Sequence, residues 1–288
     1  QFSQWVQCPH KWKLKYIDGY GQFTDNIYTM FGSAVHECIQ AYLIVMYTDS
    51  IKKANELPLD EMLMSEMKKN YLEAKDKFEE QLTNPEEMKE FYHQGCQIID
   101  DFKKKRGQYF SKKGYELVGI EKPLNYKLPN NINFVGFMDV VMKDTIRDRI
   151  KIIDIKTSTM GWNKWMKADK NKTNQLLLYK QFFAEQYDIP IEKIETEFFI
   201  VKRKVLDIDD EKCLSPYQAK LVQQYSNFAD GKTSLNRARK AISDFISECF
   251  NSQGKIKERD YPASPSKWNC NFCPYKEDRD LCDKGLIY

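Results

Sequence analysis

Two short apolar segments of the sequence carry carboxylates where a core strand normally carries Val or Ile. Asp139 lies in the first segment, and Asp154 lies in the second, two residues before Lys156. Residues two apart in a strand share a face, so Asp154 and Lys156 are expected to point together. A buried carboxylate without a partner is costly, and such groups pair, neutralise or bind a metal. The pattern therefore predicts a divalent cation held by the two aspartates, with an ammonium group beside it.

The segments that carry these aspartates are expected to be neighbouring strands. Apolar residues alternate with polar ones over 115–124, 133–142 and 150–156, and 129–131 is a Pro-Asn-Asn turn signal. The polar residues 143–149 are short enough to be a hairpin connection. Pairing of the last two strands would bring the two aspartates close together.

Two predicted helices carry further polar residues that could act at the same place. A helix over 30–47 has His36 beside its apolar stripe, and on its own such a histidine is more often a satisfied, partly buried residue. A second helix over 174–187 has Gln175 and Tyr179 one turn apart, so their side chains share a face.

The other elements are predicted more simply. Residues 50–113 are charge-rich and Met-rich, and they are expected to form a helical insertion. A strand is predicted over 195–202 with a partner at 205–208, followed by a helix from Ser215 to Gly231 and another over 233–250. Glu121, on the first predicted strand, is either an accessory carboxylate or a surface residue.

Aromatic and basic residues alternate in the segment that follows Lys156. Aromatic rings among cations suit single-stranded nucleic acid, because bases stack on the rings while lysines attract the backbone. The alternative is a surface loop that its tryptophans anchor to the body of the protein. The candidate nucleic-acid-binding residues are Trp162, Lys164, Trp165 and Lys167.

Cysteines form a second candidate metal site. Cys270, Cys273 and Cys282 lie within thirteen residues near the end of the sequence, and this spacing is typical of metal ligands. A closed site of four thiolates needs one more, for which Cys8 is the best candidate. Such a site suits either zinc or an iron–sulfur cluster. The other four cysteines are interpreted as ordinary buried thiols.

Composition limits the class of protein. The 288 residues include 30% charged and 14% aromatic residues, as expected of a folded chain rather than a disordered one. The net charge of +3 excludes a global polycation, so nucleic-acid binding would need local basic patches. No apolar stretch is long enough to span a membrane. The chain opens at Gln1 without a secretory signal, which indicates a trimmed or partial chain, and free thiols favour a reducing, cytoplasmic setting.

The spacing of the acidic motif resembles the core of the PD-(D/E)xK nuclease superfamily. Asp139 matches the first aspartate of that pattern, and Asp154-Ile155-Lys156 matches its (D/E)xK part. Two further motifs strengthen the resemblance to RecB-like members. Gly32 to His36 resembles their G-x-x-x-H helix, where the histidine is an additional metal ligand. Their Q-x-x-x-Y motif is matched by Gln175 and Tyr179.

The resemblance implies a metal-dependent phosphodiesterase. One or two Mg²⁺ or Mn²⁺ ions would be bound by His36, Asp139, Asp154 and the backbone carbonyl of Ile155. Lys156 would position or deprotonate the attacking water, or neutralise the transition state. The remaining catalytic residues, which would orient Lys156 or the DNA strand, are Gln175 and Tyr179.

The cysteines resemble the iron staple of Cas4-like and AddB-type nucleases, where one ligand near the start and three near the end bind a [4Fe-4S] cluster. The staple would comprise Cys8 and the tail 260–288, with Cys270, Cys273 and Cys282. The spacing from Cys273 to Cys282 is longer than in that family, so zinc stays an alternative.

The resemblance implies one nuclease domain over 1–288, with an α/β fold whose central mixed sheet is flanked by helices, as in restriction endonucleases. The expected activity is a DNA nuclease, in particular an exonuclease on single-stranded DNA or DNA ends, in the cytoplasm of a bacterial, archaeal or phage-infected cell. A helicase or a recombination or integration protein is a candidate partner, and no membrane is. The alternatives are a non-catalytic nucleic-acid-binding module on the same fold and a structural zinc protein.

Overall fold

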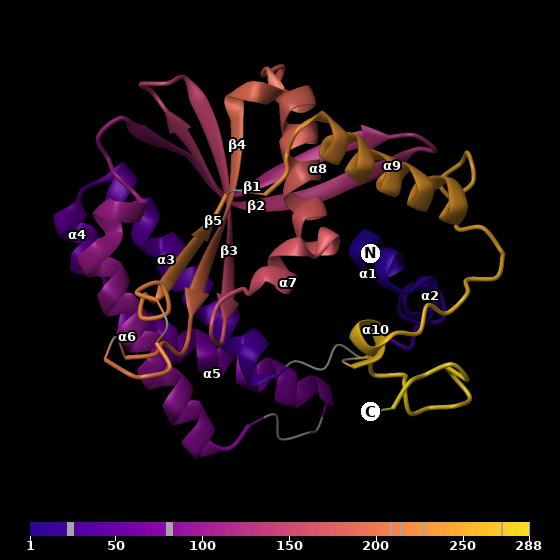
Figure 1. Cartoon of the computed structure of the whole chain (residues 1–288), viewed down its shortest axis with the longest axis horizontal. Helices are drawn as coiled ribbons and strands as arrows, with labels where there is room; N and C mark the ends of the chain where they lie inside the picture. The colour runs from indigo at the N-terminus through magenta and orange to yellow at the C-terminus, as the bar shows by residue number, and fades with distance from the viewer. Residues whose placement is uncertain are drawn as a thin grey trace.

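The computed structural model describes residues 1–21, 26–78, 83–207, 209–213, 215–226, 228–271 and 273–287, apart from the side chains of 76–78. A five-stranded sheet lies at the centre, with its strands in sequence order from one edge to the other (Figure 1). The strands are β1 (Tyr115–Leu128), β2 (Ile132–Asp144), β3 (Arg149–Ser158), β4 (Ile194–Lys202) and β5 (Val222–Tyr225).

The sheet is mixed. β1, β2 and β3 form an antiparallel meander, β4 runs parallel to β3, and β5 returns antiparallel to β4. The parallel step needs a crossover, which is made by α8 (Lys170–Tyr187) and the short 3-10 helix η1 (Ile191–Lys193). Helices cover the sheet, so the predicted restriction-endonuclease-like α/β fold is confirmed.

Two predictions for the segment after β4 are wrong. Residues 205–207 form no strand, and Ile208 lies outside the described residues. The partner of β4 is instead β5, whose Val222 pairs with Val201. The predicted helix from Ser215 to Gly231 is replaced by turns and by β5, because pairing with β4 decides the structure of this segment more strongly than its local turn signals.

One face of the sheet is covered by the helices of the N-terminal half (Figure 1). Phe102 on α6 and residues of α3 and α5 share one hydrophobic core with Ile153 of β3 and Phe199 of β4. Most of the described residues in the predicted helical stretch 50–113 are helical, and they complete this layer. The helices are α3 (Ile27–Thr48), α4 (Ile51–Asn55), α5 (Leu59–Phe78) and α6 (Pro85–Tyr109).

The opposite face packs against α8 and the helices beside it. Trp12, Phe182 and Phe245 belong to a second core, which includes Ile152 of β3 and Phe198 of β4. Ile152 and Ile153 thus enter different cores, as the two-residue period of a strand requires. The helices of this layer are α1 (Phe2–Gln7), α2 (Pro9–Tyr16), α7 (Lys164–Ala168) and α9 (Lys232–Cys249).

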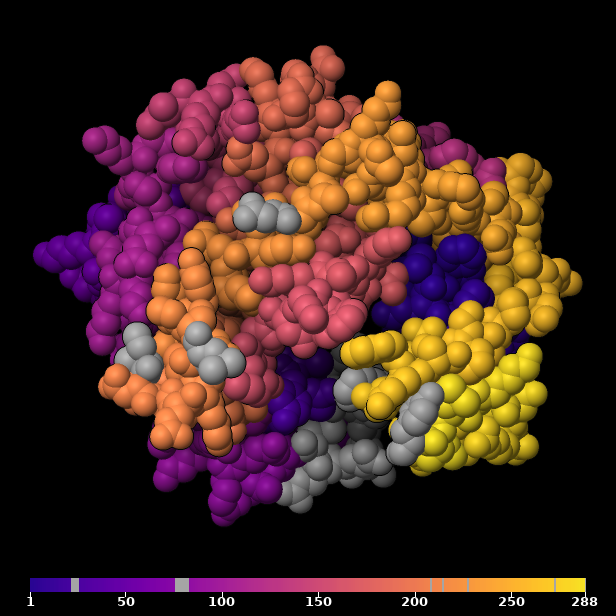
Figure 2. Space-filling model, viewed as in Figure 1, coloured from indigo at the N-terminus to yellow at the C-terminus, as the bar shows by residue number. Residues whose placement is uncertain are grey.

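The first and last segments of the chain lie side by side. In Figure 2 the yellow C-terminal segment lies against the indigo N-terminal one. His10 Nε2 is 2.7 Å from the Leu281 carbonyl oxygen, and Asn269 in α10 (Lys267–Asn271) donates a hydrogen bond to the Gln7 carbonyl at 2.7 Å. In the part of the chain described, no helix is both long enough and apolar enough to cross a membrane.

Candidate active site

The two aspartates lie where β2 and β3 stop pairing. The last cross-strand pair is Val140 with Ile153, and the next residue of each strand is Asp139 or Asp154. Beyond this point the Ile155 N–H donates to a side-chain oxygen on β2, Asp139 Oδ2, at 2.6 Å. A side-chain oxygen thus replaces a backbone acceptor, which holds Asp139 at the point where the strands diverge.

His36 reaches the same point from α3. Its Nε2 lies 3.1 Å from Asp139 Oδ2 and 3.8 Å from Glu121 Oε1. The ligand atoms of His36, Glu121 and Asp139 all lie within 4.8 Å of one another, which is close enough to share one metal ion. Residues separated by more than a hundred positions therefore converge on one site.

Gly32 explains why α3 can approach β3 so closely. A Cβ atom at Gly32 would lie 2.8 Å from Thr157 Oγ1, a distance that real Cβ contacts do not show. His36 follows one helical turn later, on the same side of α3, so the close approach at Gly32 carries the imidazole to Asp139. This packing gives a physical reason for the Gly-x-x-x-His spacing.

Asp154 and Lys156 point together, as predicted from their spacing. Lys156 Nζ donates to Asp154 Oδ1 at 3.0 Å and lies 2.8 Å from Oδ2. Asp154 is only 1% exposed, and among the described residues its Oδ2 is in the ion pair with Lys156 but accepts no hydrogen bond of its own. Burial raises the pKa of Asp154 to about 6, although the Lys156 charge opposes the rise.

The charges of the site also shift the pKa values of Lys156 and His36. Burial lowers the pKa of Lys156, but attraction to Asp154 outweighs it and the pKa is raised overall. Burial likewise lowers the pKa of His36, while its hydrogen bond with Asp139 and the charges of Asp139 and Glu121 raise it by more. In the absence of a cation, the site therefore holds protons tightly.

The site opens onto a large cleft. The cleft has a volume of about 1000 Å³, and its wall includes His36, Asp139, Ile155 and Lys156. Side chains from the first turns of α3 and from the end of β3 complete the wall, and most of them are polar. They are Asn26, Tyr28, Thr29, Ser33, Glu37, Thr157 and Thr159.

Gln175 and Tyr179, which are both on α8, lie near the two aspartate carboxylates. Gln175 Nε2 donates to the Tyr179 hydroxyl at 3.2 Å. Burial raises the pKa of Tyr179, and the nearby charges of Asp154 and Asp139 add to the rise. Within the described structure, neither side chain hydrogen-bonds to Lys156.

The two tryptophans that follow β3 differ in their exposure to solvent. Trp162 is 7% exposed and packs on Phe198 at 4.8 Å between ring centroids, which favours the interpretation of this residue as a loop anchor. Trp165 is 68% exposed, with Lys164 Nζ 5.0 Å from its ring. Lys167 instead lies over the ring of Tyr225 at 5.1 Å.

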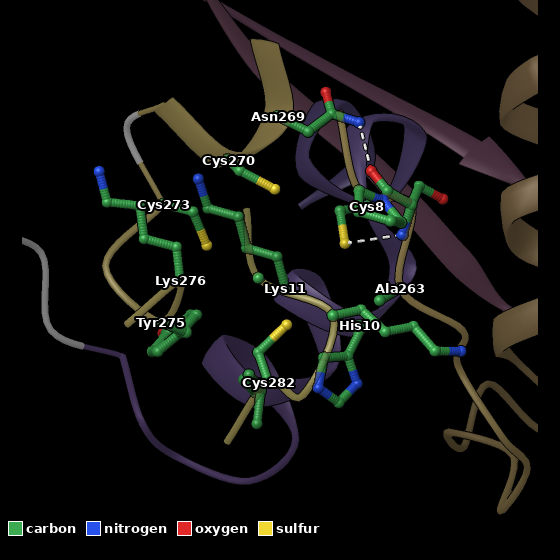
Figure 3. Close-up of a pocket in the computed structure, with 15 residues that line it drawn as sticks. Cys8, His10, Lys11, Ala263, Asn269, Cys270, Cys273, Tyr275, Lys276 and Cys282 are labelled. Atoms are coloured by element: carbon green, nitrogen blue, oxygen red, sulfur yellow. Dashed lines mark hydrogen bonds between the residues drawn. The ribbon is translucent and has the colours of Figure 1, made fainter. Parts of the chain in front are cut away.

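The four candidate cysteine ligands share one pocket. Cys8, Cys270, Cys273 and Cys282 all line it, and Figure 3 shows their sulfur atoms directed into the same space from the junction of α1 and α2, from α10 and from the C-terminal segment. All four are free thiols. Burial raises the pKa of Cys273, and the neighbouring Cys8 and Cys270 add to the rise, as expected of clustered thiols without a metal.

Two polar residues of the site were not identified by sequence patterns alone. Gln40 is 3% exposed, and its amide donates to Glu121 Oε1 at 2.7 Å and to the Asp139 carbonyl at 3.1 Å. Its position four residues after His36, on the same helical face, is the signal that could have identified it. Glu121 was left open, and it reaches the site from a left-handed backbone conformation with φ 44°.

A family model of the PD-(D/E)XK nuclease superfamily matches residues 1–278, which is nearly the whole chain. No curated protein gives a significant match.

Proposed function

The chain belongs to the PD-(D/E)XK nuclease superfamily, and from that premise we propose that it is a DNA exonuclease acting on single strands or DNA ends. The observation that carries the proposal is the convergence of His36, Glu121 and Asp139 beside the buried pair of Asp154 and Lys156, at the wall of an open cleft. Hydrolysis of a phosphodiester needs a cation, an activated water and compensation of negative charge, and these residues could provide for all three.

We propose that His36, Asp139, Asp154 and the Ile155 carbonyl bind one or two Mg²⁺ or Mn²⁺ ions. Carboxylate and carbonyl oxygens are the ligands that these ions prefer. The residues fit this role, because a buried carboxylate oxygen such as Asp154 Oδ2 is expected to have a partner. The Ile155 N–H points at Asp139, and the carbonyl of a strand residue points to the same side as its N–H. Glu121 is a further candidate ligand.

Lys156 would act as a cation in the reaction. When bound, the metal ion would lower the pKa of a coordinated water and stabilise charge on the phosphate oxygens. The raised pKa of Lys156 keeps its ammonium protonated at neutral pH, so it would donate a hydrogen bond to the attacking water or to the phosphate. The pair with Asp154 would hold this ammonium at the cleft wall.

Nucleic acid would be bound next to the metal ligands. Gln175 and Tyr179 would orient the strand, since neither hydrogen-bonds to Lys156 in the described residues. The exposed ring of Trp165 suits stacking on an unpaired base, with the charges of Lys164 and Lys167 nearby. Trp162 is left out of this surface because its ring is buried.

We propose that the cysteine pocket binds a structural [4Fe-4S] cluster, as in RecB/Cas4-like, AddB-type nucleases with an iron staple. The support is that all four sulfurs are directed into one pocket, from both ends of the chain (Figure 3). A broad absorbance near 400 nm, lost on oxidation, would be expected of the cluster and not of zinc.

The domain assignment follows the same proposal. Residues 1–288 would form one nuclease domain, with 50–113 as a helical insertion and 260–288 as a metal-staple tail that closes on Cys8. The protein would act in the cytoplasm, together with a helicase or a recombination or integration protein.

The test is a time course on end-labelled single strands, blunt duplexes and circles, with and without Mn²⁺. Asp154→Asn and Lys156→Ala are each expected to abolish cleavage while DNA binding persists. Glu197→Gln is the control, since it alters a buried ion pair with Lys151 elsewhere in the sheet. Binding without metal-dependent cleavage by the unaltered protein would support a non-catalytic nucleic-acid-binding module instead. Cleavage of circles as fast as of ends would argue against an exonuclease.

A further inference from the structure

A second cavity borders the candidate active site on the side of α8. It has a volume of about 680 Å³, within the range of about 300–1,000 Å³ that ligand sites occupy. Its wall is built by the turn between β1 and β2, α1, α8 and α9. Gln175 and Tyr179 lie in this wall, and Tyr179 is near enough to Asp154 and Asp139 for their charges to act on it.

The cavity and the carboxylates are close neighbours through Tyr179. The charges of Asp154 and Asp139 act on the tyrosine hydroxyl, and the ring lies against β2 at Gly136. A Cβ atom at Gly136 would lie 2.7 Å from Tyr179 Cε1, so the glycine is what allows this contact. Gly136 precedes Asp139 by three residues on the same strand. A nucleic-acid strand at the metal site would therefore reach the cavity within a few nucleotides.

The wall of the cavity combines aromatic rings with side-chain amides and contains no charged side chain. Phe134 and Phe250 are both partly exposed rings, and Asn131, Asn133 and Asn171 are amides of the same wall. Within the described residues, these three amides make no side-chain hydrogen bond. Amides that both donate and accept, next to aromatic rings, match the edge and the face of a nucleobase.

We propose that this cavity is a nucleobase subsite, which takes up one or two unstacked bases of the strand whose phosphate lies at the metal site. The proposal rests on the proposed nuclease function, and it assigns the substrate more narrowly. A base can enter the cavity only from an unpaired strand, so the subsite would select single-stranded DNA or a frayed end over an intact duplex. No charged side chain lines the cavity, so phosphates would lie outside it, where the cleft and the lysines of α7 would bind them.

The experiment measures binding of the strand separately from its cleavage. Asp154→Asn protein is titrated in Mg²⁺ with fluorescent single strands in which each nucleotide in turn is replaced by an abasic one. If the cavity binds a base, affinity falls about tenfold at one or two adjacent positions and stays nearly constant elsewhere, since stacking contributes about 1–3 kcal/mol per base. A flat profile along the strand would overturn the proposal.

Substitutions in the cavity wall test whether the sensitive base binds there. On the same background, replacement of both Asn133 and Asn171 by alanine is expected to weaken binding of the intact strand about tenfold, with no added loss for the strand already abasic at the sensitive position. Asn125→Ala, on β1 outside the cavity wall, should keep the original profile. An unchanged profile in the double variant would overturn the proposal, because the base would then bind elsewhere or another part of the protein would fill the cavity.

The outcome separates the two proposals. Metal-dependent cleavage of intact strands by the unaltered protein, combined with a flat abasic profile, would refute the subsite and leave the nuclease function standing. A profile with one sensitive position, in a protein that cleaves nothing, would support the subsite and refute the nuclease function.

Discussion

Replacement of Asp154 by asparagine should stabilise the protein when no metal is bound, while it abolishes cleavage. Asp154 is 1% exposed, and its Oδ2 lacks a hydrogen-bond partner in the described residues. The rise of its pKa from 3.8 to about 6 means that the folded protein disfavours the ionised carboxylate. This pKa difference means that the ionised carboxylate lowers the free energy of unfolding by about 3 kcal/mol at pH 8. The figure already includes the attraction of Lys156.

The sign of the effect depends on pH. Above pH 6 the carboxylate of the unaltered protein is ionised in both the folded and the unfolded states, so the asparagine variant gains up to about 3 kcal/mol in unfolding free energy. Between pH 6 and 3.8 the folded protein binds a proton at Asp154, and the gain declines. Below pH 3.8 both states are protonated and the gain disappears.

Urea unfolding at pH 8 and pH 5 with a chelator measures the effect. The midpoint of Asp154→Asn should lie roughly 1 M above that of the unaltered protein at pH 8, with a smaller difference at pH 5. Added Mn²⁺ should stabilise the unaltered protein more than the variant, which keeps His36, Glu121 and Asp139 but lacks one carboxylate. Equal midpoints at pH 8, or a difference that does not change with pH, would refute the reasoning.

A control for this prediction is a buried carboxylate whose oxygens both have partners. Glu197 is 5% exposed, with Lys151 Nζ 2.9 Å from Oε2 and Gln224 Nε2 donating to Oε1 at 2.8 Å. Glu197→Gln leaves the Lys151 ammonium without its anion and should lower the midpoint at pH 8. The contrast tests whether the incomplete hydrogen bonding of Asp154, whose only partner is Lys156 in the described residues, is the source of the instability, rather than burial of a charge in general.

Three further predictions concern other parts of the site. Gly32→Ala should displace α3 and reduce cleavage by about tenfold or more, whereas Gly107→Ala, whose Cβ would contact nothing within 4 Å, should cleave normally. Mn²⁺ affinity, measured by calorimetry, should fall as the pH is lowered from 8 to 6, because the raised pKa of His36 makes protons compete with the ion; constant affinity would contradict this. Cys8→Ser should lose bound metal by elemental analysis and lower the melting temperature, and Cys213→Ser, outside the pocket, should do neither.

The strands and helices that hold the acidic motif could be predicted from the sequence because their patterns are long and regular. β1, β2 and β3 contain the predicted strands, and α3 and α8 contain the predicted helices. The fold class was implied by the resemblance to the nuclease superfamily, and these elements agree with it. β5 could not be predicted, because it has only four residues and its structure depends on pairing with β4, which is distant in sequence.

Burial of individual side chains was harder to predict than secondary structure. Trp162 and Trp165 are three residues apart and have similar neighbours in the sequence, yet Trp162 is 7% exposed and Trp165 is 68% exposed. Trp162 packs on Phe198 of β4 and Tyr225 of β5, and these contacts depend on the tertiary fold. Glu121 was ambiguous for a related reason, since a positive φ of 44° is not expected for a glutamate within a strand.

The end of the β2–β3 ladder explains why charged residues occupy the middle of a buried sheet. Where two strands diverge, backbone groups lose their partners and must find others. Asp139 satisfies the Ile155 N–H with its own Oδ2, so this carboxylate is fixed by the backbone before any ligand binds. Asp154, the next residue after the ladder on β3, has no such donor and depends on Lys156 alone. The same divergence therefore produces one carboxylate that is already positioned and one that a cation would complete, which is why stability and cation binding should oppose each other at Asp154.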